Sequence, residues 1–232
     1  MPQHFTARVA GRAALAALRS GPARVFAAFE RSCYVETPAG IACLGGPDIG
    51  RGPLNALLEE FESLPVGTPM EIECSEAIMW HPSPPPALDD LPEMAVPASI
   101  RPQAAAFLAW LSGAGAPDDS LIGLGPGLTP AGDDFVGGAM IALRAFGQSA
   151  LAGRVAAWAL PLAKERTNRI SRAHLQCAAA GEGHEALHDF LKTFGKEELD
   201  RLARVGHTSG LDAAAGALLA LRLERDSRPN RD

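Results

Sequence analysis

The sequence predicts an α+β protein in which a small β-containing N-terminal unit precedes an all-helical C-terminal domain. Short β-prone runs dominate residues 23–80, a proline-rich segment covers residues 81–102, and apolar residues recur with helical spacing in the remainder. The chain has 232 residues, 47% of them hydrophobic, and can therefore bury a substantial core. We expect a mixed N-terminal domain over residues 1–100, a helical domain over residues 101–224 and a flexible tail over residues 225–232.

Charge and cysteine content exclude several classes of protein. The formal net charge is -6 and the basic residues are scattered, which argues against a nucleic-acid partner. The four cysteines include no C-x-x-C pair, so we expect reduced thiols and no disulfides. No apolar run approaches the length of a membrane span. These features are typical of a cytoplasmic protein.

The N-terminal domain is expected to combine two short helices with several strands. Residues 13–18 predict a short amphipathic helix that ends near Gly21-Pro22. A Pro38-Ala39-Gly40 turn between two β-prone runs predicts a hairpin, and apolar spacing over residues 54–64 predicts a second helix. The expected strands cover residues 25–29, 33–37, 41–44 and 70–74.

The domain boundary is expected in the proline-rich segment 81–102. This segment contains seven prolines, including Pro84-Pro85-Pro86, which cannot lie inside a helix or a central strand. Helical spacing follows almost everywhere beyond it. The expected helices cover residues 104–111, 130–146, 151–180, 185–194, 197–205 and 211–223.

The most informative segment is the glycine-rich turn at residues 121–143, which reads LIGLGPGLTPAGDDFVGGAMIAL. Its glycines permit backbone conformations and close approaches that a Cβ forbids, and the following helix directs unpaired N–H groups into the loop. Such a loop binds an anion or a metal-bridged anion. Capping of the helix by Thr129 and by one aspartate is the structural alternative, but it does not require four glycines and two adjacent carboxylates.

The adjacent aspartates Asp133 and Asp134 leave two interpretations open. A phosphate beside two carboxylates is repelled unless a cation intervenes, so both aspartates could hold a Mg²⁺ ion that bridges to the phosphate. Alternatively, Asp134 caps the helix while Asp133 acts as a base or binds an amide N–H. The sequence does not choose between these roles.

An internal echo predicts that two helix starts form one site. Residues 132–143 and 210–221 both read G-x-D-x-x-x-G-A-x-x-A-L. Small residues four apart on each helix would let the two backbones pack closely, with Asp134 and Asp212 in the first turns of their helices. We therefore expect these two aspartates to face a shared pocket.

Two further polar segments are candidate walls of this pocket. The turn at residues 205–212 offers the imidazole of His207 and the hydroxyls of Thr208 and Ser209, although Ser209 and Asp212 also resemble a capping box. Residues 167–174 are unusually polar for the middle of a long helix, and two arginines three apart suit an anionic substrate. A solvated charged face is the alternative for this second segment.

The candidate site residues fall into three groups. The candidate catalytic residues are Asp133, Asp134, His207 and Asp212. The candidate substrate-binding residues are Gly125, Gly127, Thr129, Gly132, Arg169, Ser171, Thr208, Ser209 and Gly210. The candidate metal ligands are Asp133 and Asp134, with Mg²⁺ as the cation.

A competing site is the His184-Glu185-x-x-His188 sequence, which matches the H-E-x-x-H signature of zinc hydrolases. With six histidines in the chain, a chance match is expected in about one such chain per hundred, and no extended metzincin pattern follows it. The glycines Gly181 and Gly183 before it indicate an ordinary helix start. Zinc hydrolysis is therefore the least favoured function.

Three motifs in this order resemble one bacterial family: GLGPGLTPAGDD, then T-N-R-I-S, then GHTSGLD. The family is known as a domain of unknown function and includes the small subunit assigned to the oxamate carbamoyltransferase of anaerobic allantoin breakdown. The resemblance covers residues 121–223. Relatives often have Ser after the Thr-Pro, where this chain has Ala131 and so lacks a hydroxyl.

The resemblance implies participation in carbamoyl transfer from carbamoyl phosphate to oxamate, together with two larger, different subunits. The partners expected from it are a small anionic metabolite and these subunits, with a homo-oligomer as a further form. The alternative is a non-catalytic subunit that docks against larger partners or senses a metabolite. The resemblance itself does not say whether this chain holds the active site.

Overall fold

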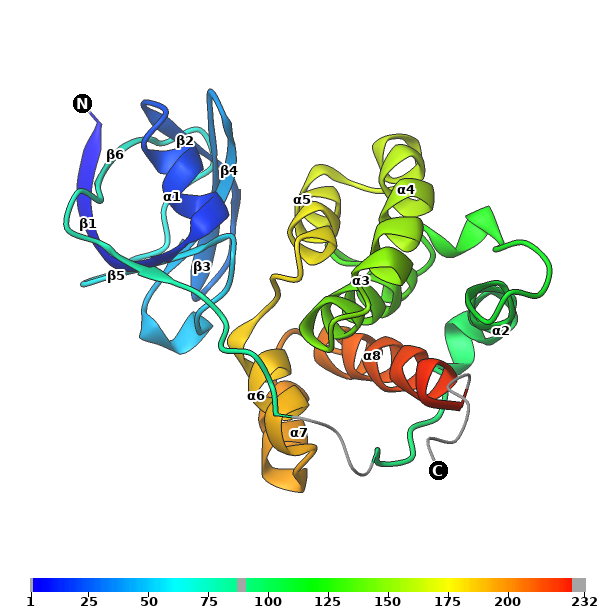
Figure 1. Ribbon diagram of the computed structural model, residues 1–232. Helices are drawn as coiled ribbons and strands as arrows, with labels where there is room; N and C mark the ends of the chain where they lie inside the picture. The colour runs from blue at the N-terminus through cyan, green and yellow to red at the C-terminus, as the bar shows by residue number, and fades with distance from the viewer. Residues whose placement is uncertain (1, 87–90, 227–232) are drawn as a thin grey trace. The chain divides into compact units, whose positions relative to one another are not determined.

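The structure is a computed structural model that describes residues 2–86 and 91–226. The chain divides into two compact units, residues 1–82 and residues 83–232 (Figure 1). The described part of the first unit consists of a sheet, one α-helix and the short 3-10 helix Pro47–Ile49, and that of the second is helical. The predicted α+β class, with a helical C-terminal region, is therefore confirmed.

The N-terminal unit is built on one sheet that closes on itself. The strand order is β5-β4-β3-β2-β6-β1-β7, and β5 also pairs with β1. The helix α1 packs against β4 and buries Ala14, Leu15, Ala17 and Leu18. The elements are β1 (Gln3–Gly11), α1 (Arg12–Leu18), β2 (Ala23–Ala28), β3 (Ser32–Thr37), β4 (Gly40–Gly45), β5 (Asn55–Leu58), β6 (Pro69–Glu73) and β7 (Ile78–Trp80).

The predicted helix over residues 54–64 is wrong, because Asn55–Leu58 form the strand β5. Ala56 and Leu58 are buried, and β5 pairs with β4 on one side and with β1 on the other. Ala56, Leu57 and Leu58 point alternately to the two faces of the sheet and are all buried, and a strand covered on both faces favours consecutive apolar residues, which also fit helical spacing. The strands β1 and β7 have no counterpart among the predicted elements.

The helical unit is arranged around α3, against which α4, α5 and α8 pack (Figure 1). Nearly all of α3 is buried, including both of its central glycines. The α-helices are α2 (Arg101–Leu111), α3 (Ala131–Ala145), α4 (Ser149–Arg166), α5 (Arg169–Ala179), α6 (Glu185–Thr193), α7 (Lys196–Leu202) and α8 (Ser209–Asp226). Of the tail expected to be flexible, residues 225 and 226 belong to α8, and residues 227–232 lie outside the described residues.

The single long helix predicted over residues 151–180 is also wrong. The chain leaves the helix at Thr167 and starts α5 after Asn168, whose side chain accepts hydrogen bonds from the backbone N–H groups of Ile170 and Ser171. Asparagine is among the preferred residues for this capping position. The polar segment therefore marks a helix start and not the middle of a helix.

The sequence also predicts the state of the cysteines and the apolar character of the helices. The four cysteines are buried thiols and form no disulfide within the described residues. Burial raises the pKa of Cys33 to about 11 and that of Cys43 to about 12, which keeps both protonated at neutral pH. None of the helices in the described ranges combines the length and the apolar character that crossing a membrane requires.

The contact between α3 and α8 depends on two glycines. A Cβ on Gly138 would collide with the backbone of Ala213, and a Cβ on Gly216 would collide with the backbone of Phe135. Each helix therefore places a glycine against the backbone of the other. The small residues that recur in the sequence echo thus permit direct backbone packing.

We expect Gly138→Ala to destabilise the protein by about 3 kcal/mol, because the new methyl group must push α8 away from α3. Gly137→Ala is the matched control in the same helix, since its Cβ would lie 3.7 Å from the Cβ of Ala178 in ordinary contact. The control should be neutral or more stable by about 0.5–1 kcal/mol. Urea unfolding of both variants measures the difference, and equal stabilities would contradict this account of the contact.

Candidate functional site

The glycine-rich loop joins a short 3-10 helix, Asp119–Leu121, to α3. Gly123, Gly125 and Gly127 have φ angles of 80°, 121° and 91°, in the region that favours glycine. A Cβ on Gly123 would collide with the carbonyl oxygen of Arg166, and one on Gly132 would collide with that of Leu121. The loop conformation therefore requires these glycines, as the sequence suggests.

Asp133 binds the loop to α5. Its Oδ1 accepts a hydrogen bond of 2.7 Å from the backbone N–H of Gly123, and its Oδ2 accepts one of 2.6 Å from the Ser171 hydroxyl. The Asp133 side chain is almost fully buried, and both of its carboxylate oxygens have partners within the protein. Its position is that of a clamp between the loop and α5.

Asn168 makes a second connection between α5 and the loop. While its Oδ1 caps α5, its Nδ2 donates a hydrogen bond of 2.8 Å to the carbonyl oxygen of Leu128. Sequence reasoning included Asn168 in the polar segment without giving it a role. An Asn that directly precedes a helical run is the signal that identifies such a cap.

Thr129 connects the loop to α8. Its hydroxyl lies 2.7 Å from that of Ser209, the first residue of α8. The capping position of α3 is occupied by Pro130, which provides no side-chain cap, so the alternative that Thr129 caps this helix is wrong. The starts of α3, α5 and α8 are therefore tied together around one loop.

Asp134 and Asp212 are the unsatisfied groups of this arrangement. Each has a buried Oδ2 without a hydrogen-bond partner, and the only other such side-chain atom in the described residues is Thr167 Oγ1. Asp212 is only 5% exposed. A buried carboxyl oxygen without a donor is costly, so its retention suggests a partner that arrives from outside.

Burial also changes the acidity of both groups. It raises the pKa of Asp134 well above its usual range. Hydrogen bonding with the hydroxyls of Ser209 and Thr129 lowers this pKa in part, and the negative charges of Asp212 and Asp133 raise it further. Burial likewise raises the pKa of Asp212, and the Thr208 hydroxyl opposes that shift. The pair therefore favours states in which at least one carboxyl holds a proton.

The two helix starts repeat one hydrogen-bond pattern. Leu124 N–H donates to the carbonyl of Leu121, and Gly132 N–H then donates to the carbonyl of Leu124. In the other start, Val205 and Gly210 make the same two bonds, with Leu202 as the first acceptor. The similarity between the two segments therefore includes the turns that precede α3 and α8, which make the same backbone hydrogen bonds.

The loop also offers backbone donors. Within the described residues, no hydrogen bond is donated by the backbone N–H of Gly125, Gly127 or Thr129. Gly125 and Gly127 are exposed, which leaves these groups accessible to a ligand. Such N–H groups near a helix start suit an anionic oxygen.

Other predicted site residues lie at the edge of this arrangement or belong to its packing. His207 and Thr208 are exposed in the turn before α8, and Arg169 is exposed in the first turn of α5. Gly210 packs against the carbonyl of Leu202, so its role here is close packing.

The H-E-x-x-H segment is arranged as a helix start. His184 Nδ1 accepts a hydrogen bond from the N–H of Ala186, and His188 Nε2 accepts one from the N–H of Gly183, both at 3.1 Å. A neutral imidazole has one acceptor nitrogen, which is also the nitrogen that would bind zinc. No group of three or more metal-binding side chains is positioned for a metal ion in the described residues. This geometry does not favour zinc hydrolysis.

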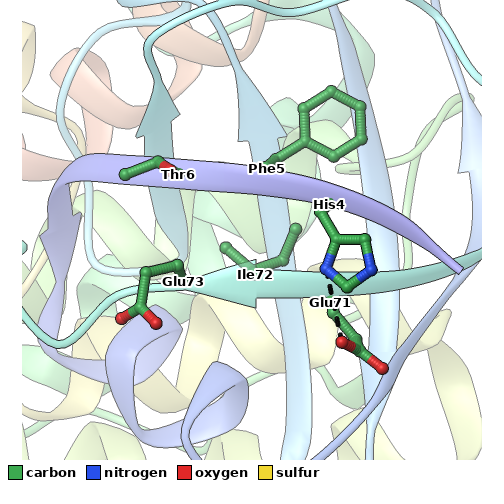
Figure 2. A pocket seen from close by; sticks show the side chains of 6 residues that line it. All are labelled: His4, Phe5, Thr6, Glu71, Ile72 and Glu73. Carbon is green, nitrogen blue, oxygen red and sulfur yellow. Dashed lines mark ion pairs between the residues drawn. The ribbon is translucent and has the colours of Figure 1, made fainter.

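A hollow of about 330 Å³ lies along β1 and β6 in the N-terminal unit (Figure 2). His4 Nδ1 lies 3.3 Å from a carboxylate oxygen of Glu71, and both side chains are largely exposed. The backbone N–H of Ser75 lowers the pKa of the nearby Glu73. The hollow contains no buried charged group, so it is a weaker candidate than the loop site.

The fold and the site together define an α+β protein whose helical unit joins a glycine-rich loop to two aspartates at helix starts, each with a buried carboxyl oxygen. Residues 121–221 match the model of a family described as oxamate carbamoyltransferase subunit AllH. The family assignment made from the sequence is confirmed over this region, which contains the loop and both aspartates. Neither a curated protein nor a solved structure was found to match the chain.

We expect Ser171→Ala to lower the free energy of unfolding by about 1–3 kcal/mol, because it leaves Asp133 Oδ2 buried without its donor. Ser112→Ala is the control, since the Ser112 hydroxyl donates to the carbonyl of Ala109 at the exposed end of α2. The control should change stability by less than about 0.5 kcal/mol. Chemical denaturation measures both values, and equal losses would contradict the clamp.

The raised pKa of Asp134 predicts a pH-dependent stability. The folded state holds this proton more tightly than the unfolded state, so the stability contribution is lost as pH rises above about 3.8 and through the raised pKa. Asp134→Asn removes this titration, and the variant should gain in Tm relative to the wild type as the pH rises from about 3.8 through the raised pKa. Asp200→Asn makes the same chemical change at an exposed position of α7 and serves as control. A Tm difference that does not vary with pH would refute this assignment.

Proposed function

We propose that this chain is a component of a carbamoyltransferase that acts on a small carboxylate such as oxamate, and that the loop site binds a reactant. One observation carries the proposal: Asp134 and Asp212 each hold a buried, unpartnered carboxyl oxygen at packed helix starts within the matched region. The family description, which names an oxamate carbamoyltransferase subunit, supports the reaction class. The same description supports action together with other subunits.

The chemistry of carbamoyl transfer suits these groups. The acceptor nitrogen attacks the carbamoyl carbon, the bond from that carbon to the phosphate oxygen breaks, and the nitrogen loses a proton. An amide nitrogen is a weak nucleophile and needs a base, and burial raises the pKa of Asp134 toward the range useful for that role. The proton then passes to Asp134 while phosphate leaves.

The phosphate and the carbonyl oxygen require donors. We propose that the free N–H groups of Gly125, Gly127 and Thr129 supply them, as oxyanion-binding groups do in acyl transfer. Asp133 acts here as a positioning residue, because both of its oxygens already bind the protein. A Mg²⁺ ion held by Asp134 and Asp212 is the alternative to this arrangement, because these are the carboxyls left to bind a cation, and it would compete with their roles toward nitrogen.

A second candidate function is docking without catalysis. Leu128 and Leu211 are 41% and 40% exposed, and each directly precedes a polar residue of the site. Apolar side chains in such positions suit contact with another subunit. In this alternative the loop recognises a partner or senses a metabolite.

A thermal-shift experiment on the full chain tests the proposal. Carbamoyl phosphate and oxamate are added with and without Mg²⁺, and at about 100 times Kd a ligand should raise Tm by roughly 5 °C. Asp134→Asn and Asp212→Asn should reduce the shift at the same ligand concentration, while Asp200→Asn should retain it in full. Unchanged ligand responses in both site variants would overturn the assignment. Absence of ligand binding by the chain, combined with stable co-purification with partner subunits, would favour docking.

A further inference from the structure

Asp134 and Asp212 occupy equivalent positions in two copies of one structural motif. Asp134 N–H donates to the carbonyl of Pro130, and Asp212 N–H donates to that of Thr208, both at 3.0 Å. Four residues after each aspartate, a glycine packs on the residue that directly follows the other aspartate. The two carboxyls are therefore related by an approximate two-fold arrangement.

This arrangement presents two like acceptors to one ligand. Each aspartate has one buried Oδ2 without a donor, and the side chains of Thr129 and Ser209 lie beside the Asp134 carboxyl. The raised pKa values are those of the ligand-free protein, and a ligand that presents N–H groups favours the ionised carboxyls. The oxygens of an ionised carboxyl accept hydrogen bonds and repel anionic oxygens, so they select such a ligand. Two such acceptors fit a group that carries N–H donors on two sides.

We propose that the Asp134–Asp212 pair binds a ureido group, with one carboxyl accepting a hydrogen bond from each of its two nitrogens. This inference rests on the function proposed above and names the part of the ligand that the aspartates recognise. A ureido group is what carbamoyl transfer to an amide nitrogen creates: the acceptor nitrogen becomes bonded to the carbamoyl carbon, which keeps its own NH₂. The aspartates therefore bind the nitrogens of both reactants, and phosphate lies away from them.

The hydroxyls complete the recognition. Thr129 and Ser209 lie 2.7 Å apart, and because one hydroxyl donates to the other, the second has a hydrogen to offer. That hydrogen can be given to Asp134 or to a ligand carbonyl oxygen. The site thus combines acceptors for nitrogen with a donor for oxygen, as a ureido group requires.

Isothermal titration of the full chain with four probes tests the inference. Carbamoylated oxamate carries a ureido group, oxamate carries one amide nitrogen, and oxalate and N,N-dimethyloxamate carry no N–H. We expect carbamoylated oxamate to bind most tightly and the two probes without N–H most weakly, with about tenfold in Kd for each lost hydrogen bond. Asp212→Asn should reduce the advantage of carbamoylated oxamate over oxamate, and Asp200→Asn should leave it unchanged.

The outcomes separate this inference from the function on which it rests. If oxalate binds as tightly as oxamate and carbamoylated oxamate, the aspartates do not recognise N–H groups of the ligand. The ureido inference then fails, while binding of a small carboxylate stands. Equal preference for carbamoylated oxamate in Asp212→Asn and the wild type also overturns it. If neither these probes nor carbamoyl phosphate binds, the ureido inference and the proposed function both fail.

Discussion

The direct backbone contact between α3 and α8 is the constraint on which the rest of the helical unit depends. Gly138 and Gly216 let each helix approach the other without an intervening side chain. This approach brings Ser209 within hydrogen-bonding distance of Thr129 and places the charge of Asp212 near Asp134. A wider separation, as larger residues would impose, removes both relations at once. The site is therefore a consequence of helix packing as much as of its polar residues.

Two adjacent aspartates have different roles because their surroundings differ. Asp133 accepts hydrogen bonds from two donors, the N–H of Gly123 and the hydroxyl of Ser171, and these bonds hold the loop against α5. Consecutive residues lie about 100° apart around a helix, so Asp134 faces a different side of α3 from Asp133. On that side its Oδ2 is buried without a donor. A satisfied buried carboxyl stabilises the structure, whereas a buried carboxyl oxygen without a donor costs free energy, which is why the proposed ligand contact is assigned to Asp134 and not to Asp133.

Much of the helical unit follows from local chemistry that the sequence displays. The glycines of the loop have the positive φ angles expected of them, and the echo around Asp134 and Asp212 corresponds to packed helix starts. The break at Asn168 is equally local, yet long helical spacing on both sides obscures it. The strand β5 is different, because its apolar residues fit a helix and a strand alike, and only pairing with β4 and β1 decides between them.

The sequence by itself determined the α+β class, the loop's need for glycine and the family of residues 121–221, since these depend on residue type and spacing along the chain. Only the tertiary structure decided which carboxyl is satisfied. Asp133 and Asp134 are chemically identical, and their difference arises from Ser171 and Ser209, residues far along the chain that folding brings to one aspartate or the other. Hydrogen-bond partners of this kind depend on three-dimensional distance, which residue spacing alone does not contain.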